Sequence, residues 1–205
     1  MSATIKLHHN DLPASVSFAG SVAIDTETLG LKPRRDRLCL VQLSAGDGSA
    51  HLVQLDGKDF SVPRLRALLA DTSILKIFHF ARFDMGVLAH HLSVVPEPVY
   101  CTKIASKLAR TYTDRHWLKD LCSELLGIDL SKQQQSSDWG ADKLSDQQKH
   151  YAASDVLHLH ALKGKLDAML KREGRMAIAE ACFRFLPTRA TLDIAGFEDE
   201  DIFAH

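Results

Sequence analysis

The chain lacks the cysteine and histidine patterns that hold zinc. Its four cysteines are scattered, with no pair at C-x-x-C spacing, and none of its 11 histidines lies four residues from another. These absences argue against a zinc site, a histidine metal site and a disulfide framework. Scattered cysteines also fit a reducing compartment, so we expect a cytoplasmic protein.

Long apolar runs are missing as well. No stretch approaches the roughly 20 apolar residues that a membrane-spanning helix needs. Residues 1–10 also lack the apolar core of a signal peptide. The sequence therefore predicts no membrane partner.

An excess of basic charge is the third absence. Lys and Arg together number 25 against 26 Asp and Glu, which gives a formal net charge of −1. Proteins that hold long nucleic acid electrostatically usually carry a clear basic excess. Any phosphate must therefore be bound by a local basic surface or by metal.

What is present is a set of strand signals followed by helix signals, in a chain of 205 residues that can form one complete core. This order predicts an α/β domain, a sheet flanked by helices. We expect a single domain over residues 1–205, in which the acidic end, 187–205, is a tail or an arm on a partner subunit. The expected strands are 21–24, 38–43, 51–55 and 74–78, and the expected helices are 63–69, 81–91, 102–109, 118–126, 145–172 and 177–185.

Acidic residues follow two of the strands and recur in a late helix. Residues two apart on a strand share a face, so Asp25 and Glu27 present their carboxylates together. Residues four apart on a helix are neighbours, so Tyr151 and Asp155 also share a face. Asp84, near the start of its helix, can supply a fourth carboxylate. Each segment alone has an ordinary explanation at a protein surface, but four gathered carboxylates would repel one another unless cations held them. The set predicts two divalent ions, Mg²⁺ or Mn²⁺, and with them hydrolysis or phosphoryl transfer.

Longer motifs surround these residues: D-T-E-T-L-G-L at 25–31, K-I-F-H-F-A-R-F-D at 76–84, S-D-W-G at 137–140 and L-S-D-Q-Q-K-H-Y-A-A-S-D-V at 144–156. With them the chain resembles the DEDD superfamily of 3′–5′ exonucleases, in the tyrosine-bearing branch around ribonuclease D. The resemblance covers about residues 22 to 162. It implies an RNase H-like mixed β-sheet flanked by α-helices.

The resemblance also implies roles for single residues. Asp25, Glu27, Asp84 and Asp155 would be the metal ligands, and Tyr151 would orient or deprotonate the attacking water. Ribonuclease D carries further C-terminal helical RNA-binding domains, for which this chain is too short. The chain is therefore most similar to the stand-alone NrnC-type nanoRNases, which degrade dinucleotides and other very short oligonucleotides. That similarity implies a homo-oligomer in the form of an octameric ring.

One position in the last motif has two candidates. The sister branch of the superfamily uses histidine five residues before its last aspartate, and His150 has that spacing from Asp155. At 3.6 residues per turn, however, four residues nearly complete one revolution and five overshoot it. Ser145 and Gln148 form a capping box, so position 150 is already helical and His150 points away. The sequence favours Tyr151 and keeps His150 as the alternative.

We expect substrate contacts from five further side chains. Leu31 is either a wedge against terminal bases or a leucine that anchors its turn, and Thr28 lies in the same segment. His79 and Arg82 precede the third metal ligand and are expected near a scissile or terminal phosphate. Trp139 either stacks on a base or packs the domain, and packing is the commoner role.

The sequence as a whole predicts a two-metal-ion 3′–5′ exoribonuclease that hydrolyses short oligoribonucleotides, especially dinucleotides, to 5′-mononucleotides. Short RNA is the expected partner, and DNA stays open. One rival is a general 3′–5′ exonuclease that trims longer RNA or DNA ends. Another is a catalytically silent nucleic-acid-binding module that keeps the fold.

Overall fold

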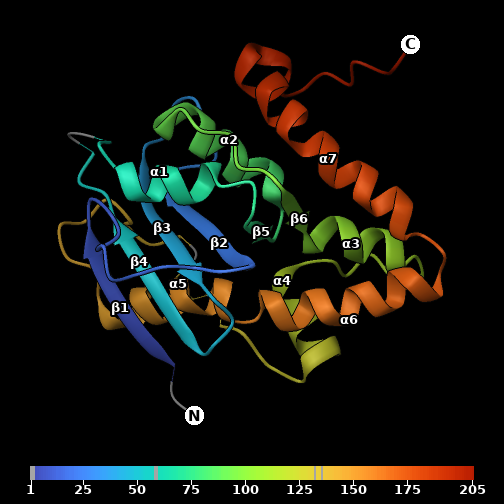
Figure 1. Cartoon of the computed structure of the whole chain (residues 1–205), viewed down its shortest axis with the longest axis horizontal. Helices are drawn as coiled ribbons and strands as arrows, with labels where there is room; N and C mark the ends of the chain where they lie inside the picture. The colour runs from blue at the N-terminus through green and yellow to red at the C-terminus, as the bar shows by residue number, and fades with distance from the viewer. Residues whose placement is uncertain (1–2, 58–59, 132, 135) are drawn as a thin grey trace.

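A six-stranded mixed sheet runs through the protein in the order β1-β4-β3-β2-β5-β6 (Figure 1). The computed structural model describes residues 3–57, 60–131, 133–134 and 136–205. β3 pairs antiparallel with β2 and with β4, and the other neighbouring strands run parallel. The predicted α/β architecture is confirmed. The strands are β1 (Thr4–His9), β2 (Ser21–Thr28), β3 (Leu38–Ser44), β4 (Ser49–Gln54), β5 (Leu75–Phe78) and β6 (Val99–Cys101).

Helices cover both faces of the sheet. Figure 1 shows α1 and α2 across one face and α5 across the other, with α3, α6 and α7 grouped beyond β6. Among the residues that the structure describes, no helix combines the length and the apolar character needed to cross a membrane. The helices are α1 (Pro63–Ala70), α2 (Ala81–Leu92), α3 (Thr102–Ala109), α4 (Leu118–Leu121), α5 (Asp146–Leu157), α6 (Leu159–Arg172) and α7 (Met176–Leu192), with π-helical turns at Cys122–Leu126 and Asp193–Phe197.

The central strands are buried because their side chains are apolar on both faces. Every residue of β3 is buried, as expected for a strand covered by helices on both sides. β3 and β4 form the predicted hairpin, in which Gly46 and Gly48 take positive φ values of 78° and 85°. These two glycines make the turn at no steric cost.

Several expected elements have different bounds. The helix expected over 145–172 is divided at His158 into α5 and α6, and the helix expected to end before Pro187 continues to Leu192. β1 and β6 were not expected. Both belong to the edges of the sheet. No residue of β1 is fully buried, and β6 is buried but has only three residues, so neither gives a clear apolar pattern.

Candidate active site

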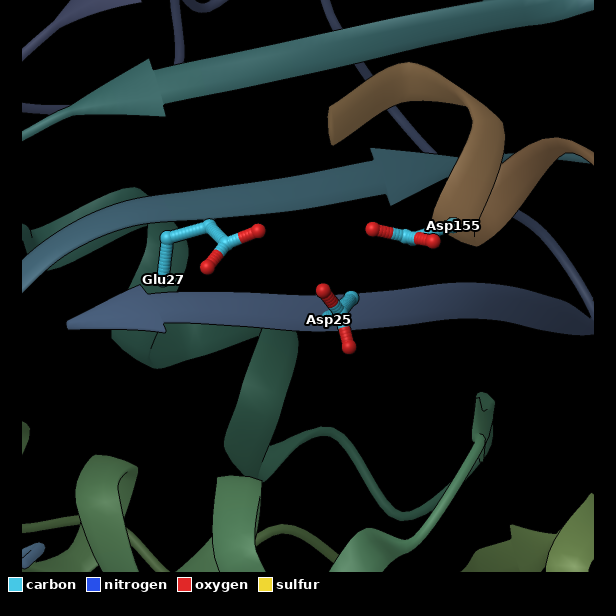
Figure 2. A group of neighbouring side chains, drawn as sticks. All are labelled: Asp25, Glu27 and Asp155. Carbon is cyan, nitrogen blue, oxygen red and sulfur yellow. The ribbon is translucent and has the colours of Figure 1, made fainter. Parts of the chain in front are cut away.

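Three carboxylates, those of Asp25, Glu27 and Asp155, meet where α5 crosses β2. Each offers one oxygen, and these three oxygens lie within 4.8 Å of one another. Figure 2 shows the Glu27 and Asp155 carboxylates directed into the same space between β2 and α5. The capping box forms as predicted: Ser145 Oγ accepts from the Gln148 amide at 3.1 Å, and Gln148 Oε1 accepts from the Ser145 amide at 2.9 Å. This cap starts α5 and thereby sets which face of the helix meets the sheet.

Asp84 lies beside this trio, at the first turn of α2. It is 3% exposed, and the Thr26 hydroxyl donates to its Oδ1 at 2.6 Å. Burial and the nearby charge of Asp25 raise the pKa of Asp84, and the Thr26 hydrogen bond opposes that rise. Thr26, which lies between Asp25 and Glu27 on β2, therefore holds the Asp84 carboxylate in place.

Burial and mutual repulsion dominate the electrostatics of the acids. Burial raises the pKa of Asp25 to about 7. Burial together with the charges of Asp25, Asp155 and Asp84 raises the pKa of Glu27 to about 10. The pKa of Asp155 is raised by burial and by Asp25. A site of this kind stabilises a bound cation, and carboxylate oxygens are the ligands that Mg²⁺ and Mn²⁺ prefer. The donor set therefore fits divalent metal.

The structure separates the two candidates for the residue beside Asp155. Tyr151 lines the cleft over the acids, and its hydroxyl lowers the pKa of the Asp155 carboxyl. Burial and the charges of Asp155, Glu27 and Asp25 raise the pKa of this phenol. His150 is exposed, and its Nδ1 lies 2.7 Å from the carbonyl oxygen of Asp146, one turn back along the helix.

The acids open into a cleft of about 540 Å³. Leu31 lies at this cleft with 87% of its surface exposed. Thr28 also lines it, although its hydroxyl donates to the carbonyl oxygen of Gly30. Trp139 lines it as well, but only 2% of its surface is exposed, and it packs with Cys39, Leu40, Leu52, Leu144 and Ala152.

His79 and Arg82, the two residues expected near phosphate, have different surroundings. His79 lines the cleft, but burial and Lys103 lower its pKa to about 3, so it carries no charge for a phosphate. The Arg82 guanidinium donates to both carboxylate oxygens of Asp193, at 2.7 and 2.9 Å. We therefore do not assign Arg82 to the substrate.

Sequence reasoning missed several residues of this cleft. Gln42 on β3 is buried, and its Nε2 donates to Asp25 at 3.4 Å. Trp117, the residue before α4, and Lys119, in its first turn, line the cleft. Strand pairing brings Gln42 opposite Asp25, a long-range relation that no local spacing reveals. Trp117 and Lys119 carry no motif of their own.

A mixed sheet that gathers half-buried carboxylates and a tyrosine at one cleft defines the class of metal-dependent enzymes that act on phosphodiesters. The profile of a family described as 3′–5′ exonuclease matches residues 4–171. The chain belongs to this family, which confirms the predicted resemblance.

Curated relatives and solved structures agree with this assignment. Ribonuclease D of Granulibacter bethesdensis is 33% identical over 156 residues, 76% of this chain and 39% of that protein. Ribonuclease D of Acidiphilium cryptum is 35% identical over 156 residues, again 76% of this chain and 39% of that protein. The chain thus spans about two fifths of the length of these relatives.

The similarity to one group of solved structures extends over the whole chain. Brucella melitensis NrnC bound to pGG is 59% identical, with a TM-score of 0.96 and 100% of both chains covered. Brucella melitensis NrnC with bound Mg²⁺ is 58% identical, with a TM-score of 0.95, and 98% of this chain and 99% of that chain are covered. Escherichia coli RNase D is 29% identical, with a TM-score of 0.74, over 84% of this chain and 45% of that chain.

Proposed function

We propose that the protein is a divalent-metal-dependent 3′–5′ exonuclease that hydrolyses short oligoribonucleotides, especially dinucleotides, to 5′-mononucleotides. The observation that carries this proposal is the acidic trio. Asp25, Glu27 and Asp155 place three carboxylate oxygens within 4.8 Å of one another, at a cleft that Tyr151 also lines. A binding module has no need for such a cluster, since buried like charges lower stability.

We propose separate roles for the residues of the site. Asp25, Glu27, Asp84 and Asp155 would hold two divalent ions, and the Thr26 hydroxyl fixes the Asp84 carboxylate. When bound, such ions activate a water and stabilise the departing 3′ oxygen. Tyr151 lines the same cleft and would orient or deprotonate the attacking water.

Three observations favour a small substrate. The cleft volume of about 540 Å³ lies in the range of about 300–1,000 Å³ that is typical of small-ligand sites. The net charge of −1 supplies no general attraction for long strands. The similar Brucella protein binds pGG, a dinucleotide. The rival, trimming of longer RNA, is supported by the similarity to RNase D of Escherichia coli, described as involved in structured RNA processing.

Turnover measured on RNA of increasing length distinguishes the dinucleotide preference from trimming of longer RNA. We would measure kcat/KM with Mg²⁺ or Mn²⁺ on RNA of two to ten nucleotides with matched 3′ ends. The proposal expects the highest value for the dinucleotide and a steady fall with length. Values that stay flat or rise with length would rule out the dinucleotide preference but leave the exonuclease. Asp155→Asn, measured beside it, should lose turnover at every length, and equal hydrolysis by this variant would overturn the site itself.

A further inference from the structure

His79 lies at the proposed active site and has a ring nitrogen without a partner among the described residues. The residue follows β5 and lines the same cleft as the acids. Its Nδ1 lies 2.9 Å from Thr102 Oγ1. Its Nε2 is buried and has no hydrogen-bond partner among the described residues. A buried polar atom in this state calls for an explanation, and at a binding cleft a ligand supplies one.

The neighbours of His79 determine which ring nitrogen carries the proton. The hydroxyl of Thr102, which is fully buried, donates its single proton to the carbonyl oxygen of Phe78 at 3.2 Å. Thr102 Oγ1 can therefore only accept from His79, so the proton of the imidazole is on Nδ1. Nε2 is left with a bare lone pair. It is a hydrogen-bond acceptor.

The charge of Lys103 keeps a second proton off the ring. Its Nζ lies 4.2 Å from the centre of the Phe80 ring and 3.9 Å from that of Trp117. These two cation–π contacts hold the ammonium near His79. Protonation of Nε2 would bury a second cation beside it, without a carboxylate partner, so the ring stays neutral.

A bare acceptor at this place limits the substrate groups that it can bind. Phosphodiester oxygens carry no proton at neutral pH, so they cannot donate to Nε2. The N–H groups of bases differ from one base to the next and would make the site specific for certain sequences. A 2′-hydroxyl is a donor that every ribonucleotide brings and that DNA lacks.

We propose that His79 Nε2 accepts a hydrogen bond from a 2′-hydroxyl of the substrate and thereby selects RNA over DNA. This inference rests on the exonuclease function proposed above. It replaces the phosphate contact expected for His79 with a contact to the sugar. Thr102 acts as a positioning residue, because its hydroxyl fixes the tautomer that leaves Nε2 free to accept.

The test compares dinucleotides that differ only at the sugar. We would measure kcat/KM with Mg²⁺ for a ribodinucleotide and for its 2′-deoxy and 2′-fluoro counterparts, neither of which can donate. His79→Phe keeps a ring of similar size and removes the acceptor. It should lower kcat/KM for the ribodinucleotide roughly 10- to 100-fold, as expected for a hydrogen bond left unmade, and leave the other two nearly unchanged. His9→Phe, at an exposed position on the edge strand β1, is the matched control and should behave as wild type.

A second pair of variants tests the tautomer and does not depend on how His79→Phe folds. Thr102→Val removes the hydroxyl at constant shape and should reduce the preference for RNA, whereas Thr102→Ser keeps the hydroxyl and should preserve it. Equal losses on all three substrates in both His79→Phe and Thr102→Val would overturn the 2′-hydroxyl contact. So would a loss that follows removal of the 3′-hydroxyl alone. If wild type hydrolysed none of the dinucleotides, the dinucleotide activity proposed above would fail, and with it the basis of this inference.

Discussion

Burial and like charge decide the protonation of single side chains in this cleft. Glu27 faces the charges of three other acids, and its pKa rises to about 10. Burial and the charges of Asp155, Glu27 and Asp25 raise the pKa of Tyr151. At neutral pH and without metal, Glu27 therefore carries a proton. A divalent cation reverses this preference, because it is the largest local charge at such a site.

The contest between Tyr151 and His150 yields a direct prediction. Tyr151→Phe removes the hydroxyl that lowers the pKa of Asp155 and keeps the ring that packs 6.0 Å from Trp139, centre to centre. We expect kcat to fall by roughly 10²–10⁴, the usual contribution of a positioned proton donor or acceptor. His150→Phe, at the exposed neighbouring position, should stay close to wild type. A small loss in Tyr151→Phe with a large loss in His150→Phe would reverse the assignment.

At the scale of whole elements, α7 shows why sequence patterns failed to predict its length. Pro187 predicts a helix end, since it lacks the amide proton of the helical ladder. Yet Ala179, Phe183, Leu186 and Ala190 are buried at helical spacing on both sides of it. Burial of this continuous apolar face outweighs one lost hydrogen bond. Pro187 is a local signal for a helix end, whereas the burial that extends the helix depends on tertiary packing.

The division between α5 and α6 has a similar cause. No glycine or proline lies between Asp146 and Arg172 except Gly164, so the sequence predicts one continuous helix. α5 packs on the strands, whereas α6 packs on α3, and the chain turns at His158 to change partners. Patterns of apolar residues predict that a helix exists more reliably than where it bends.

The end of α7 is tied to α2 through Asp193. This carboxylate is 8% exposed, and it accepts hydrogen bonds from Arg82 and, at 2.6 Å, from Arg189. Asp193→Ala should lower the free energy of unfolding by about 1–3 kcal/mol, because it removes the carboxylate that both guanidinium groups share and leaves them only backbone carbonyl acceptors. Glu180→Ala, at an exposed site on the same helix, should change it by less than about 0.5 kcal/mol. Urea denaturation measures both, and equal midpoints would contradict this role for the α2–α7 tie.

At the scale of the whole molecule, the site is assembled from three segments that the fold brings together. The parts with local spacing could be predicted: Asp25 with Glu27 on a strand, and Tyr151 with Asp155 on a helix. The hydrogen bond from Thr26 to Asp84 joins residues 58 positions apart, and the contact of His79 with Thr102 joins residues 23 positions apart. No spacing rule predicts contacts between residues so far apart in the sequence. The sequence thus predicts which acids are present, and the fold determines what holds them.

The gathering of the acids makes the stability of the whole protein depend on pH and metal. The folded-state pKa values of Asp25 and Glu27, about 7 and about 10, exceed their ordinary values of 3.8 and 4.5. The folded protein therefore holds protons that the unfolded chain releases. Without metal, these two groups reduce stability increasingly as pH rises above about 4. The contribution of Asp25 is complete near pH 7, and that of Glu27 near pH 10.

Divalent metal should counter this loss, because it binds the folded state. At a concentration 100 times its dissociation constant, the stabilisation is about 2.7 kcal/mol. Thermal unfolding at pH 6 and pH 8, in EDTA or in MgCl₂, measures both effects. We expect the rise in Tm with Mg²⁺ to be larger at pH 8, where fewer protons compete for the carboxylates. Glu27→Gln removes one acid and should be more stable than wild type in EDTA at pH 8, yet gain less from Mg²⁺. If wild type showed the same Tm with and without saturating Mg²⁺ at both pH values, the acids would not share a metal site.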